Sequence, residues 1–502
     1  MAAPSPLSRP RMWALGLLLI AGVAVFASCG GDDDAGTATE PEPEAAEPET
    51  EATTSGDDST VELDPEETEL VSFSQDVQPL ITATCARCHT GDGPGTPHLR
   101  MDTAEDISDN AFSIAAAIGI EAMPPWPATD LSVPFQDDWS LSEDQRAAVA
   151  AWHEEGAPLD VDPATVITPD AGVFALADHD LDVAPAAGYS GVAGQPDEYR
   201  CLIYDPQVTE TSYLDAFEFV PDQTAVVHHA IGYLIPNNLR DRAEQRDGED
   251  GQPGWSCFGS SGLGEDDIFL GWAPGQGPTE LPAGSGMRLE PGDFIVVQIH
   301  YHFDIDAPSD LSSLKLRWSD DPDPDEVYVA SYFAPAEIPC GPDESGPLCD
   351  RDAAIADAIA KYGQEGVQGL FITAACGYDP ADFELVDGVV GGECTQPAEG
   401  RGGEIVSVLG HAHELGKTFR MTLNPGTAQE QVLLDIARWD FDWQFNYYPV
   451  ESITVGPGDW VSLECSWDRN LRDPDLEPAY ILWADGTDDE MCFATMLIRE
   501  TG

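Results

Sequence analysis

Basic residues are scarce in this sequence. Its 502 residues include 21 Lys and Arg against 93 Asp and Glu, which gives a formal net charge of -72 at pH 7. A surface with so few cations repels phosphate backbones and anionic lipid headgroups, so we expect no nucleic acid partner and no direct binding to a membrane surface. The charge suits a salty or exposed environment, because screening shortens the reach of self-repulsion. The length is enough for three domains of ordinary size plus linkers.

The N-terminus also lacks an apolar run long enough for a confident membrane span, which needs about 20 residues. Its run WALGLLLIAGVAVFA follows Arg9 and Arg11 and leads through two small residues to Cys29, the layout of an export signal. The stretch FASC resembles the lipobox of bacterial lipoproteins, with Phe26 where Leu is commoner. This resemblance implies a lipoprotein signal peptide over 1–29, with Cys29 as the lipidated residue. The alternatives are an uncleaved anchor or an ordinary secretory signal.

Each of these alternatives places the rest of the chain outside the cytoplasm. We therefore expect a protein of the bacterial cell envelope that faces the periplasm or the exterior and reaches the membrane through its lipid anchor only. Large apolar residues are nearly absent from 30–69, which is acidic and rich in Pro and Thr. Such a segment cannot bury enough apolar surface to offset its chain entropy, so we predict a disordered acidic tether there.

The stretch SFSQDVQPLITATCARCHTGDG carries Cys85, Cys88 and His89 in the spacing C-x-x-C-H. This is the attachment signature of c-type haem, in which two thioethers hold the porphyrin and the following His is an axial iron ligand. A zinc knuckle would need a second Cys or His pair in suitable spacing, and none follows nearby. A thioredoxin-like pair would need a βαβ surround, whereas LSEDQRAAVAAWHEEG looks helical and opens with a capping box, Ser142-x-x-Gln145. We predict a small all-α cytochrome c-like domain.

That domain is expected to cover residues 70–160. Its second axial ligand is Met123 in our interpretation, because two prolines follow it in IEAMPPWPA and stiffen the loop. The loop resembles the Met-Pro ligand loop of many small cytochromes c. Met101 is a second candidate, His98 or His153 would give bis-His ligation, and an ordinary core role for Met123 is the remaining alternative.

Single histidines are missing after residue 200, where all six occur in pairs. The pairs are His228 with His229, His300 with His302, and His411 with His413. A lone His in a strand is usually a satisfied core or surface residue. Three pairs of histidines with no unpaired histidine in the same part of the chain instead indicate metal binding.

The pattern around two of the pairs predicts strands. In GDFIVVQIHYHFD the apolar residues alternate with Gln298, His300 and His302, which therefore share one face. In EIVSVLGHAHELGKTF, His411 and His413 share a face if the strand is regular. Two imidazoles held at i and i+2 are near enough to bind one metal with little loss of entropy.

Four motifs occur in order: VVHHAIGYL, GWAPGQGPTELPAGSGMRLEPGDFIVVQIHYH, GHAHELGK and DDEMCFATM. Together they resemble the copper type II, ascorbate-dependent monooxygenases, which include peptidylglycine α-hydroxylating and dopamine β-monooxygenase. The likeness covers roughly residues 190–502. It implies two coppers in two all-β, jelly-roll-like sandwich domains that face each other across a solvent-filled cleft. We place these domains at 187–325 and 326–502, after a linker over 161–186.

The resemblance also implies the ligands. An electron-transfer copper would be held by His228, His229 and His300, and the copper that binds dioxygen by His411, His413 and Met491, with Met496 as the nearest rival of Met491. A thioether is soft and favours Cu(I), whereas a zinc site gains nothing from it. The two adjacent histidines can reach one copper if their strand bulges or if they use different ring nitrogens.

Two further polar residues lie near the proposed ligands. Gln298 matches a Gln of the family motif and is a candidate for orienting a ligand from behind. His302 has no counterpart, and it would either compete with His300 or support a ligand in the same way.

Eight cysteines remain once Cys29, Cys85 and Cys88 are set aside, an even number for an oxidising compartment. The resemblance implies a disulfide between Cys465 and Cys492, next to Met491. For the rest we predict three pairs: Cys201 with Cys257, Cys340 with Cys349, and Cys376 with Cys394. Other connectivities remain open.

The sequence departs from the family where peptidylglycine enzymes clamp a substrate carboxylate with Arg, Asn and Tyr. Those places hold Leu409, Phe493 and Thr495. We therefore reject peptide amidation and expect a neutral or cationic small substrate, including an apolar one. The segment 335–400, with its four cysteines, looks like an insertion that reshapes the cleft.

These features predict a monooxygenase that hydroxylates an unactivated or benzylic-type C–H bond with dioxygen, two copper ions and one haem c. Ascorbate or an envelope electron carrier would supply electrons, and the fused haem domain would donate or relay them at high effective concentration. The alternative is a copper and haem electron-transfer lipoprotein without a substrate. A β-sandwich adhesion module would leave the six paired histidines unexplained.

Overall fold

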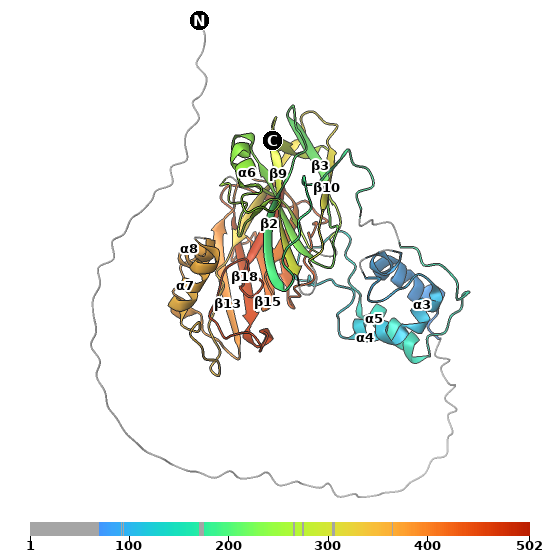
Figure 1. The fold of residues 1–502 in the computed structure, drawn as a ribbon. Coiled ribbons are helices and arrows are strands. Elements are labelled where there is room, and N and C mark those ends of the chain that lie inside the picture. Colours follow the sequence, from blue (N-terminus) through green and yellow to red (C-terminus); the bar gives the residue numbers. More distant parts are fainter. Residues whose placement is uncertain are drawn as a thin grey trace, which may run out of the picture. The chain divides into compact units, whose positions relative to one another are not determined.

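The computed structural model describes residues 70–91, 93, 95–169, 175–264, 267–273, 276–303, 307–363 and 365–501. The predicted signal peptide with Cys29 and the predicted tether over 30–69 lie outside these residues. A helical region precedes a much larger region of β-sheets (Figure 1). Nowhere in the described ranges is a helix both long and apolar enough to cross a bilayer.

Residues 70–169 form the helical domain, in which α3, α4 and α5 lie together (Figure 1). Its helices are η1 (Phe73–Val77), α1 (Gln78–Leu80), η2 (Ile81–Cys85), α2 (Ala86–His89), α3 (Ala104–Asp109), α4 (Ala111–Gly119) and α5 (Glu143–Glu154), where η1 and η2 are π-helical turns. The capping box predicted at Ser142 and Gln145 is confirmed at the start of α5. Trp152 on α5 packs against Phe73 in a small apolar core, which fixes α5 against the first turns.

A five-stranded sheet carries the first two histidine pairs. Its order is β5 (Trp255–Ser256), β2 (Gln195–Tyr204), β9 (Phe294–Phe303), β4 (Val227–Ile235) and β6 (Asp267–Trp272). The alternation predicted for β9 is confirmed, because Ile295, Val297, Ile299, Tyr301 and Phe303 all enter one hydrophobic core. Gln298 and His300 therefore lie on the opposite face of this central strand. A short helical excursion, η3 (Asn237–Leu239) and α6 (Arg240–Arg246), follows β4.

A nine-stranded sheet joins the two regions predicted as separate β domains. Its order is β1 (Leu181–Val183), β10 (Ser313–Trp318), β3 (Ser212–Val220), β8 (Ser285–Leu289), β11 (Asp325–Phe333), β20 (Phe493–Arg499), β14 (Gly403–His411) and β17 (Thr454–Val455), with β7 (Thr279–Glu280) on β3. The predicted boundary at 325/326 lies at the start of β11. There Asp325 and Glu326 pair in parallel with β8, while the rest of β11, from Val327 to Phe333, pairs with β20.

A four-stranded sheet packs on the C-terminal core. Its order is β13 (Val389–Pro397), β18 (Trp460–Asp468), β15 (Gly416–Leu423) and β16 (Gln431–Ile436). Two short strands, β12 (Glu337–Ile338) and β19 (Ile481–Leu482), pair beside it, and η6 (Arg469–Leu471) follows β18.

The prediction of an insertion over 335–400 is wrong at the C-terminal end of this segment. Its helices are α7 (Arg351–Tyr362), η4 (Glu365–Val367), α8 (Gln368–Ala375) and η5 (Pro380–Asp382), of which α7 and α8 lie side by side in Figure 1. The strand β13, however, pairs with all of β18 and belongs to the core sheet. Its two glycines and its cysteine weaken the apolar alternation that would have revealed a strand.

The segment 126–139, within the range predicted for the haem domain, packs on the C-terminal sheet. The backbone N–H groups of Thr129 and Val133 donate to the carbonyls of Asp435 (2.8 Å) and Val432 (3.0 Å) on β16. β16 is the last strand of its sheet, so this segment covers an edge that would otherwise expose unpaired backbone groups.

The described parts of the predicted linker, 161–186, belong to the domains on either side of it. Ile167 is buried in the core of the helical domain, and its N–H donates to the carbonyl of Asp102. Farther along, β1 pairs with β10 at the edge of the nine-stranded sheet.

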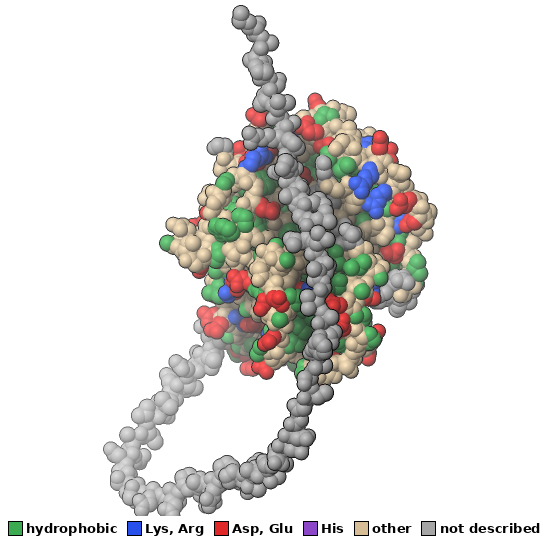
Figure 2. Space-filling model, turned by 90° about the vertical axis from the view of Figure 1, so that its left-hand side faces the viewer, with side chains coloured by type: hydrophobic (Ala, Val, Ile, Leu, Met, Phe, Trp, Pro, Cys, Tyr) green, Lys and Arg blue, Asp and Glu red, His purple; other side chains and the backbone are tan. Residues whose placement is uncertain are grey.

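The acidic composition is visible on the surface. Figure 2 shows Asp and Glu side chains scattered over the face in view, with few Lys and Arg among them. The charge is spread over many elements, which agrees with a general solvating role rather than with one binding patch.

Candidate metal centre

One cavity of about 780 Å³ receives residues from the helical domain and from both β regions. The predicted site residues that line it are Cys85, Cys88, His89, Met123, His228, His229, Gln298, His411, His413 and Met491. The structure thus brings together side chains as far apart in the sequence as Cys85 and Met491. Nothing in the local sequence pattern required the haem motif and the histidine pairs to meet.

The first three histidines form a compact nitrogen cluster. Nδ1 of His229 lies 3.2 Å from Nδ1 of His228 and 3.3 Å from Nδ1 of His300. One ring nitrogen from each residue falls within 4.8 Å of the others, an arrangement that can hold a metal ion. Three imidazole nitrogens facing one another without a carboxylate among them suit copper chemistry.

A β-bulge explains how adjacent residues reach one point. Val227 pairs with Tyr301 on β9 and His229 pairs with His300, which leaves His228 as the extra residue of the bulge. The bulge turns both side chains of the pair toward His300 instead of toward opposite faces of the sheet. Burial and the neighbouring histidines hold the pKa of His229 well below its usual value, and the neutral imidazole is the form that binds metals.

His411 and His413 are oriented by acceptors behind them. Nδ1 of His411 donates to Oε1 of Gln444 (2.6 Å), and Nδ1 of His413 donates to the backbone carbonyl of Asp489 (3.0 Å). The amide nitrogen of Gln444 donates to the carbonyl of Phe441, which fixes the amide orientation. A proton on Nδ1 leaves Nε2 as the ring atom with a lone pair for a metal, so both rings fit a ligand role.

The strand predicted to carry this pair is shorter than expected. β14 ends at His411, so His413 lies in the following turn and the pair does not share a strand face. The rings nevertheless lie 5.0 Å apart, measured between their centroids. The turn brings them together because Glu490 binds the backbone N–H groups of His413 (2.9 Å) and Leu415 (2.6 Å).

Met491 and its rival Met496 lie in different surroundings. Met491 lines the cavity with His411 and His413, whereas Met496 is fully buried in the C-terminal core on β20. The disulfide between Cys465 and Cys492 holds the residue after Met491 to β18. Of these two methionines, only Met491 is therefore placed to contribute a thioether beside His411 and His413.

Glu490 is a residue of the site that the sequence did not single out. Its side chain is 0 % exposed and accepts hydrogen bonds from the N–H groups of His413, Leu415 and Met491 and from the indole of Trp467. Burial raises its pKa to about 8, although these four donors act in the opposite direction. The only signal in the sequence was an acidic residue in DDEMC, directly before a proposed ligand.

The two histidine sets lie close together, which differs from the solvent-filled cleft that the family resemblance implied. The ring centroids of His229 and His411 are 6.3 Å apart, and Phe441 stacks on His228 at 5.1 Å. A contact between the two β regions accounts for this closeness, because Nε2 of Gln276 donates to the backbone carbonyl of Gln444 (2.6 Å).

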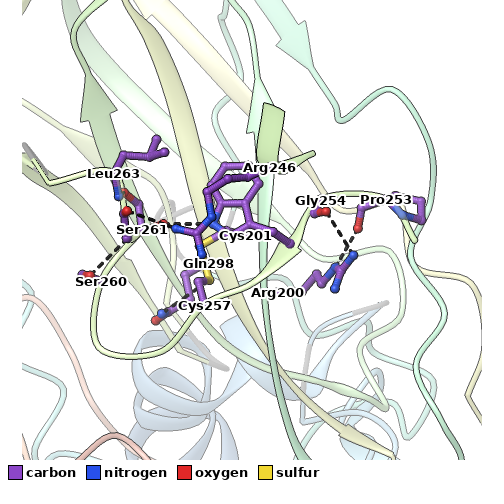
Figure 3. The surroundings of a disulfide bond; sticks show 12 residues. Arg200, Cys201, Arg246, Pro253, Gly254, Cys257, Ser260, Ser261, Leu263 and Gln298 are labelled. Carbon is purple, nitrogen blue, oxygen red and sulfur yellow. Dashed lines mark hydrogen bonds between the residues drawn. A yellow bond between two sulfur atoms is a disulfide. The ribbon is translucent and has the colours of Figure 1, made fainter. Parts of the chain in front are cut away.

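The two other polar residues of β9 differ in position. Gln298 is 2 % exposed, lines the cavity and donates to Sγ of Cys257 at 3.7 Å, beside the disulfide with Cys201 (Figure 3). His302 stands apart from the nitrogen cluster found among the described residues. Its backbone N–H donates to the carbonyl of Val226, the residue before β4.

All four predicted disulfides are confirmed. The bonds are Cys201–Cys257, Cys340–Cys349, Cys376–Cys394 and Cys465–Cys492. The first supports β2 beneath the histidine cluster, the next two lie in the predicted insertion, and the last fixes the Met491 turn.

The helical domain presents its own set of ligand atoms. Nδ1 of His89 donates to the backbone carbonyl of Leu99 (2.7 Å), which leaves Nε2 as the atom for an iron. Cys85 and Cys88 are not disulfide-bonded, and burial raises the pKa of the Cys85 thiol to about 11. A Cβ on Gly95 would come within 2.7 Å of the His89 ring, so glycine lets the backbone pass close to this side chain. The donor set fits a covalently attached haem.

Three of the four candidates for the second axial position line the cavity, and one does not. Met123, Met101 and His98 all line the cavity. His153 is not among the lining residues, and its ring instead contacts Phe112 at 5.7 Å.

The cavity has no described Lys or Arg among its lining residues. Leu409 and Phe493, at the places where peptidylglycine enzymes bind a carboxylate, both line it. The acidic lining residues are Asp442 and Asp485, and burial raises the pKa of Asp442. No Lys or Arg side chain among the described lining residues is therefore available to pair with an anionic group.

A buried arginine holds the loop that leads to the Cys201–Cys257 disulfide. Arg200 is 3 % exposed, binds both carboxylate oxygens of Asp250 (2.6 and 2.8 Å) and donates to the carbonyls of Pro253 and Gly254, as Figure 3 shows in part. Its hydrogen bond lowers the pKa of Asp250 to about 2. A carboxyl with a lowered folded-state pKa stabilises the fold above its unfolded pKa, and this contribution is lost as the pH falls toward 2.

The variant Asp250→Asn should therefore be less stable than the parent at pH 7, by about 1–3 kcal/mol, since a buried guanidinium loses its charged partner. The difference between the two proteins should shrink as the pH falls from 4 toward 2. Urea unfolding at several pH values measures both effects. A difference that stays constant over this range would contradict the assigned pairing.

Comparison with known proteins gives one distant relative. The chain is 24 % identical over 286 residues to DBH-like monooxygenase protein 1 of Gallus gallus, a match that covers 55 % of this chain and 39 % of that protein. The chain thus spans about two fifths of the length of this relative. The match is distant, and the name of this relative describes a monooxygenase.

No family model matches the sequence. Among solved structures, PNGF-II is 8 % identical with a TM-score of 0.27, over 64 % of this chain and 66 % of that one. Allantoicase is also 8 % identical, with a TM-score of 0.16, over 62 % of this chain and 81 % of that one. Likenesses this weak carry no argument about fold or function.

Proposed function

We propose that this protein is a copper-dependent monooxygenase that uses dioxygen to hydroxylate a C–H bond of a small neutral or cationic molecule. The observation that carries the proposal is that one cavity is lined by Met491 and by members of both histidine sets, with His300 beside His228 and His229. The absence of Lys and Arg from the described lining supports the substrate class. The distant monooxygenase homology supports the reaction type.

The chain supplies two different ligand sets. His228, His229 and His300 would hold one copper, and the second would be held by the set His411, His413 and Met491. When bound, the coppers supply one-electron redox chemistry and dioxygen activation, with the thioether favouring Cu(I). The protein's own part is to hold the ligands and, for His411 and His413, to keep the ring proton on Nδ1, away from Nε2.

The residues around these ligands shape the reaction space. Gln444 and the carbonyl of Asp489 keep His411 and His413 in one tautomer. Phe441, Phe493 and Leu409 give the cavity apolar walls that exclude water from a reactive site. A substrate would be positioned by shape and by contact with Asp442 or Asp485 if it carries a positive charge.

The helical domain is proposed to carry haem c as electron donor or relay. Cys85 and Cys88 would form the thioethers, His89 the first axial bond and Met123 the second. Support comes from the hydrogen bond of His89 to Leu99 and from the shared cavity. Export as an envelope lipoprotein anchored through Cys29 and reduction by ascorbate or an envelope carrier complete the proposal.

Metal content per chain is the first test, measured by plasma mass spectrometry on the chain that begins at residue 30. We expect two coppers and one iron. Oxygen uptake should then require both a reductant such as ascorbate and an accepted substrate, sought among neutral and amine-bearing aromatic and aliphatic compounds. Zinc in place of copper would refute the proposal. Copper and haem without reductant-dependent oxygen uptake would favour the electron-transfer lipoprotein instead.

A further inference from the structure

We propose that the helical domain is a fixed internal electron donor, docked by residues 126–139 on the edge strand β16 and connected to the His228 side of the copper pair by the segment 439–447. This inference rests on the proposed function, because it needs both haem and copper. It goes further by naming the docking surface, the route and the point of entry.

The docking segment is integrated into the C-terminal β region. Besides the backbone bonds of Thr129 and Val133 to β16, the N–H of Gln136 donates to the carbonyl of Tyr448 (2.8 Å), and the N–H of Val450 donates to the carbonyl of Pro134 (2.8 Å). Phe135 is buried in the C-terminal core itself. A segment held by a ladder of backbone bonds and a buried ring is a part of the sheet rather than a loose linker.

A charged side chain of the C-terminal β region also forms hydrogen bonds with the helical domain. The guanidinium of Arg438 donates to the carbonyls of Ile120 (3.1 Å) and Glu121, directly after α4 ends at Gly119. A cation at this end is favoured by the helix dipole and satisfies carbonyls that have no intrahelical partner. Met123, the proposed axial ligand, follows two residues after Glu121, so Arg438 fixes the approach to the haem pocket.

The segment 439–447 contacts the docking segment at one end and the histidines at the other. Between ring centroids, Tyr447 lies 5.2 Å from Trp126, and Phe445 lies 5.3 Å from Trp139. Trp126 comes three residues after Met123 and contacts Trp139 at 4.7 Å. Aromatic rings in contact keep the gaps short between successive groups, and electron transfer weakens steeply as such gaps widen.

Phe441 forms the copper-side end of the route. It stacks on His228 with centroids 5.1 Å apart and planes at 27°, whereas it meets His413 edge-on at 6.0 Å and 75°. The closer, stacked contact assigns entry to the His228, His229 and His300 set. In the step, Fe(II) haem loses one electron to become Fe(III), and one Cu(II) becomes Cu(I), without a proton or a bond being moved.

The test follows electron transfer rather than turnover. The oxidised holoprotein, free of oxygen and substrate, is mixed with less than one equivalent of reductant, and the haem absorbance and the Cu(II) paramagnetic resonance signal are followed together. We expect reduced haem to reoxidise as the Cu(II) signal falls, with a rate constant that does not change over a tenfold range of protein concentration. A rate proportional to concentration, or reduced haem that persists beside Cu(II), would overturn the inference.

Two variants test the docking and the route separately. Arg438→Met should slow the transfer by about tenfold or more, because two charge-assisted hydrogen bonds are lost. The matched control is Arg401→Met, an exposed arginine whose partners are Glu326 and Glu500 and which should leave the rate unchanged. Phe441→Leu should slow the transfer while the Gln444 bond to His411 remains. An unchanged rate in Arg438→Met would overturn the docking, and an unchanged rate in Phe441→Leu would overturn the route.

Metal analysis, the haem spectrum and the haem reduction potential are measured on every protein. If the parent lacks copper or haem, the proposed function fails. If both are present and the transfer is intermolecular, only the present inference fails, and a monooxygenase with an external donor remains.

Discussion

Replacing Met491 with leucine is expected to remove the thioether while nearly keeping the side-chain volume. Copper content should fall from two toward one per chain at limiting metal, and monooxygenase turnover should fall by at least about 10–100-fold, the range seen even for residues that only support a metal ligand. The reason is that Met491 alone among the two candidate methionines lines the cavity with His411 and His413. Copper titration and oxygen uptake measure the two effects.

The matched control is Met496→Leu, a similar exchange on the adjoining strand β20. Met496 lies in the C-terminal core, where a volume-conserving exchange costs below about 1.5 kcal/mol. This variant should keep both coppers and most of its activity. If Met496→Leu lost copper and Met491→Leu did not, the ligand assignment would be reversed.

Replacing Glu490 with alanine is expected to destabilise the whole C-terminal β region. Four N–H groups lose a buried acceptor: those of His413, Leu415 and Met491 and the indole of Trp467. Each buried donor left unsatisfied costs about 1–3 kcal/mol, so we expect a loss of about 3 kcal/mol or more in the free energy of unfolding. Urea unfolding measures the loss, and copper titration should show weakened binding at His413 and Met491.

The variant Glu490→Gln tests the two carboxyl oxygens as separate acceptors. Its amide oxygen can still accept from the side that serves His413, Met491 and Trp467, but its amide nitrogen would face the N–H of Leu415. We therefore expect a stability between those of the parent and Glu490→Ala. Alanine and glutamine variants as stable as the parent would show that Glu490 does not hold this turn.

The alternating pattern made some of the fold predictable. The apolar face of β9 and the shared face of Gln298 and His300 follow from a two-residue period, which depends only on neighbouring residues. The four disulfides and the Ser142 capping box were also predicted. These features share a local or chemically restricted origin, because a cysteine has few partners and a cap spans three residues.

Other features depended on contacts between distant segments. The end of β14 at His411, the strand β13 within the predicted insertion and the sheet shared across 325/326 were missed or misplaced. Glycine-rich or short strands carry weak patterns, so their pairing is decided by the partner strand. Glu490 and Gln444 were missed for a related reason, since a buried polar residue is recognised by its partners and not by its neighbours in sequence.

The sequence by itself determined which ligand atoms the chain offers: the C-x-x-C-H stretch, three histidine pairs, Met491 and a scarcity of cations. Only the tertiary structure decided that the C-x-x-C-H stretch, two of the histidine pairs and Met491 share one cavity. It also decided that a bulge at His228 turns two adjacent rings to one point, and that residues 126–139 bring the helical domain to β16. Residue types specify the available chemistry directly. Their convergence depends on long-range backbone pairing and core packing, which no local pattern encodes.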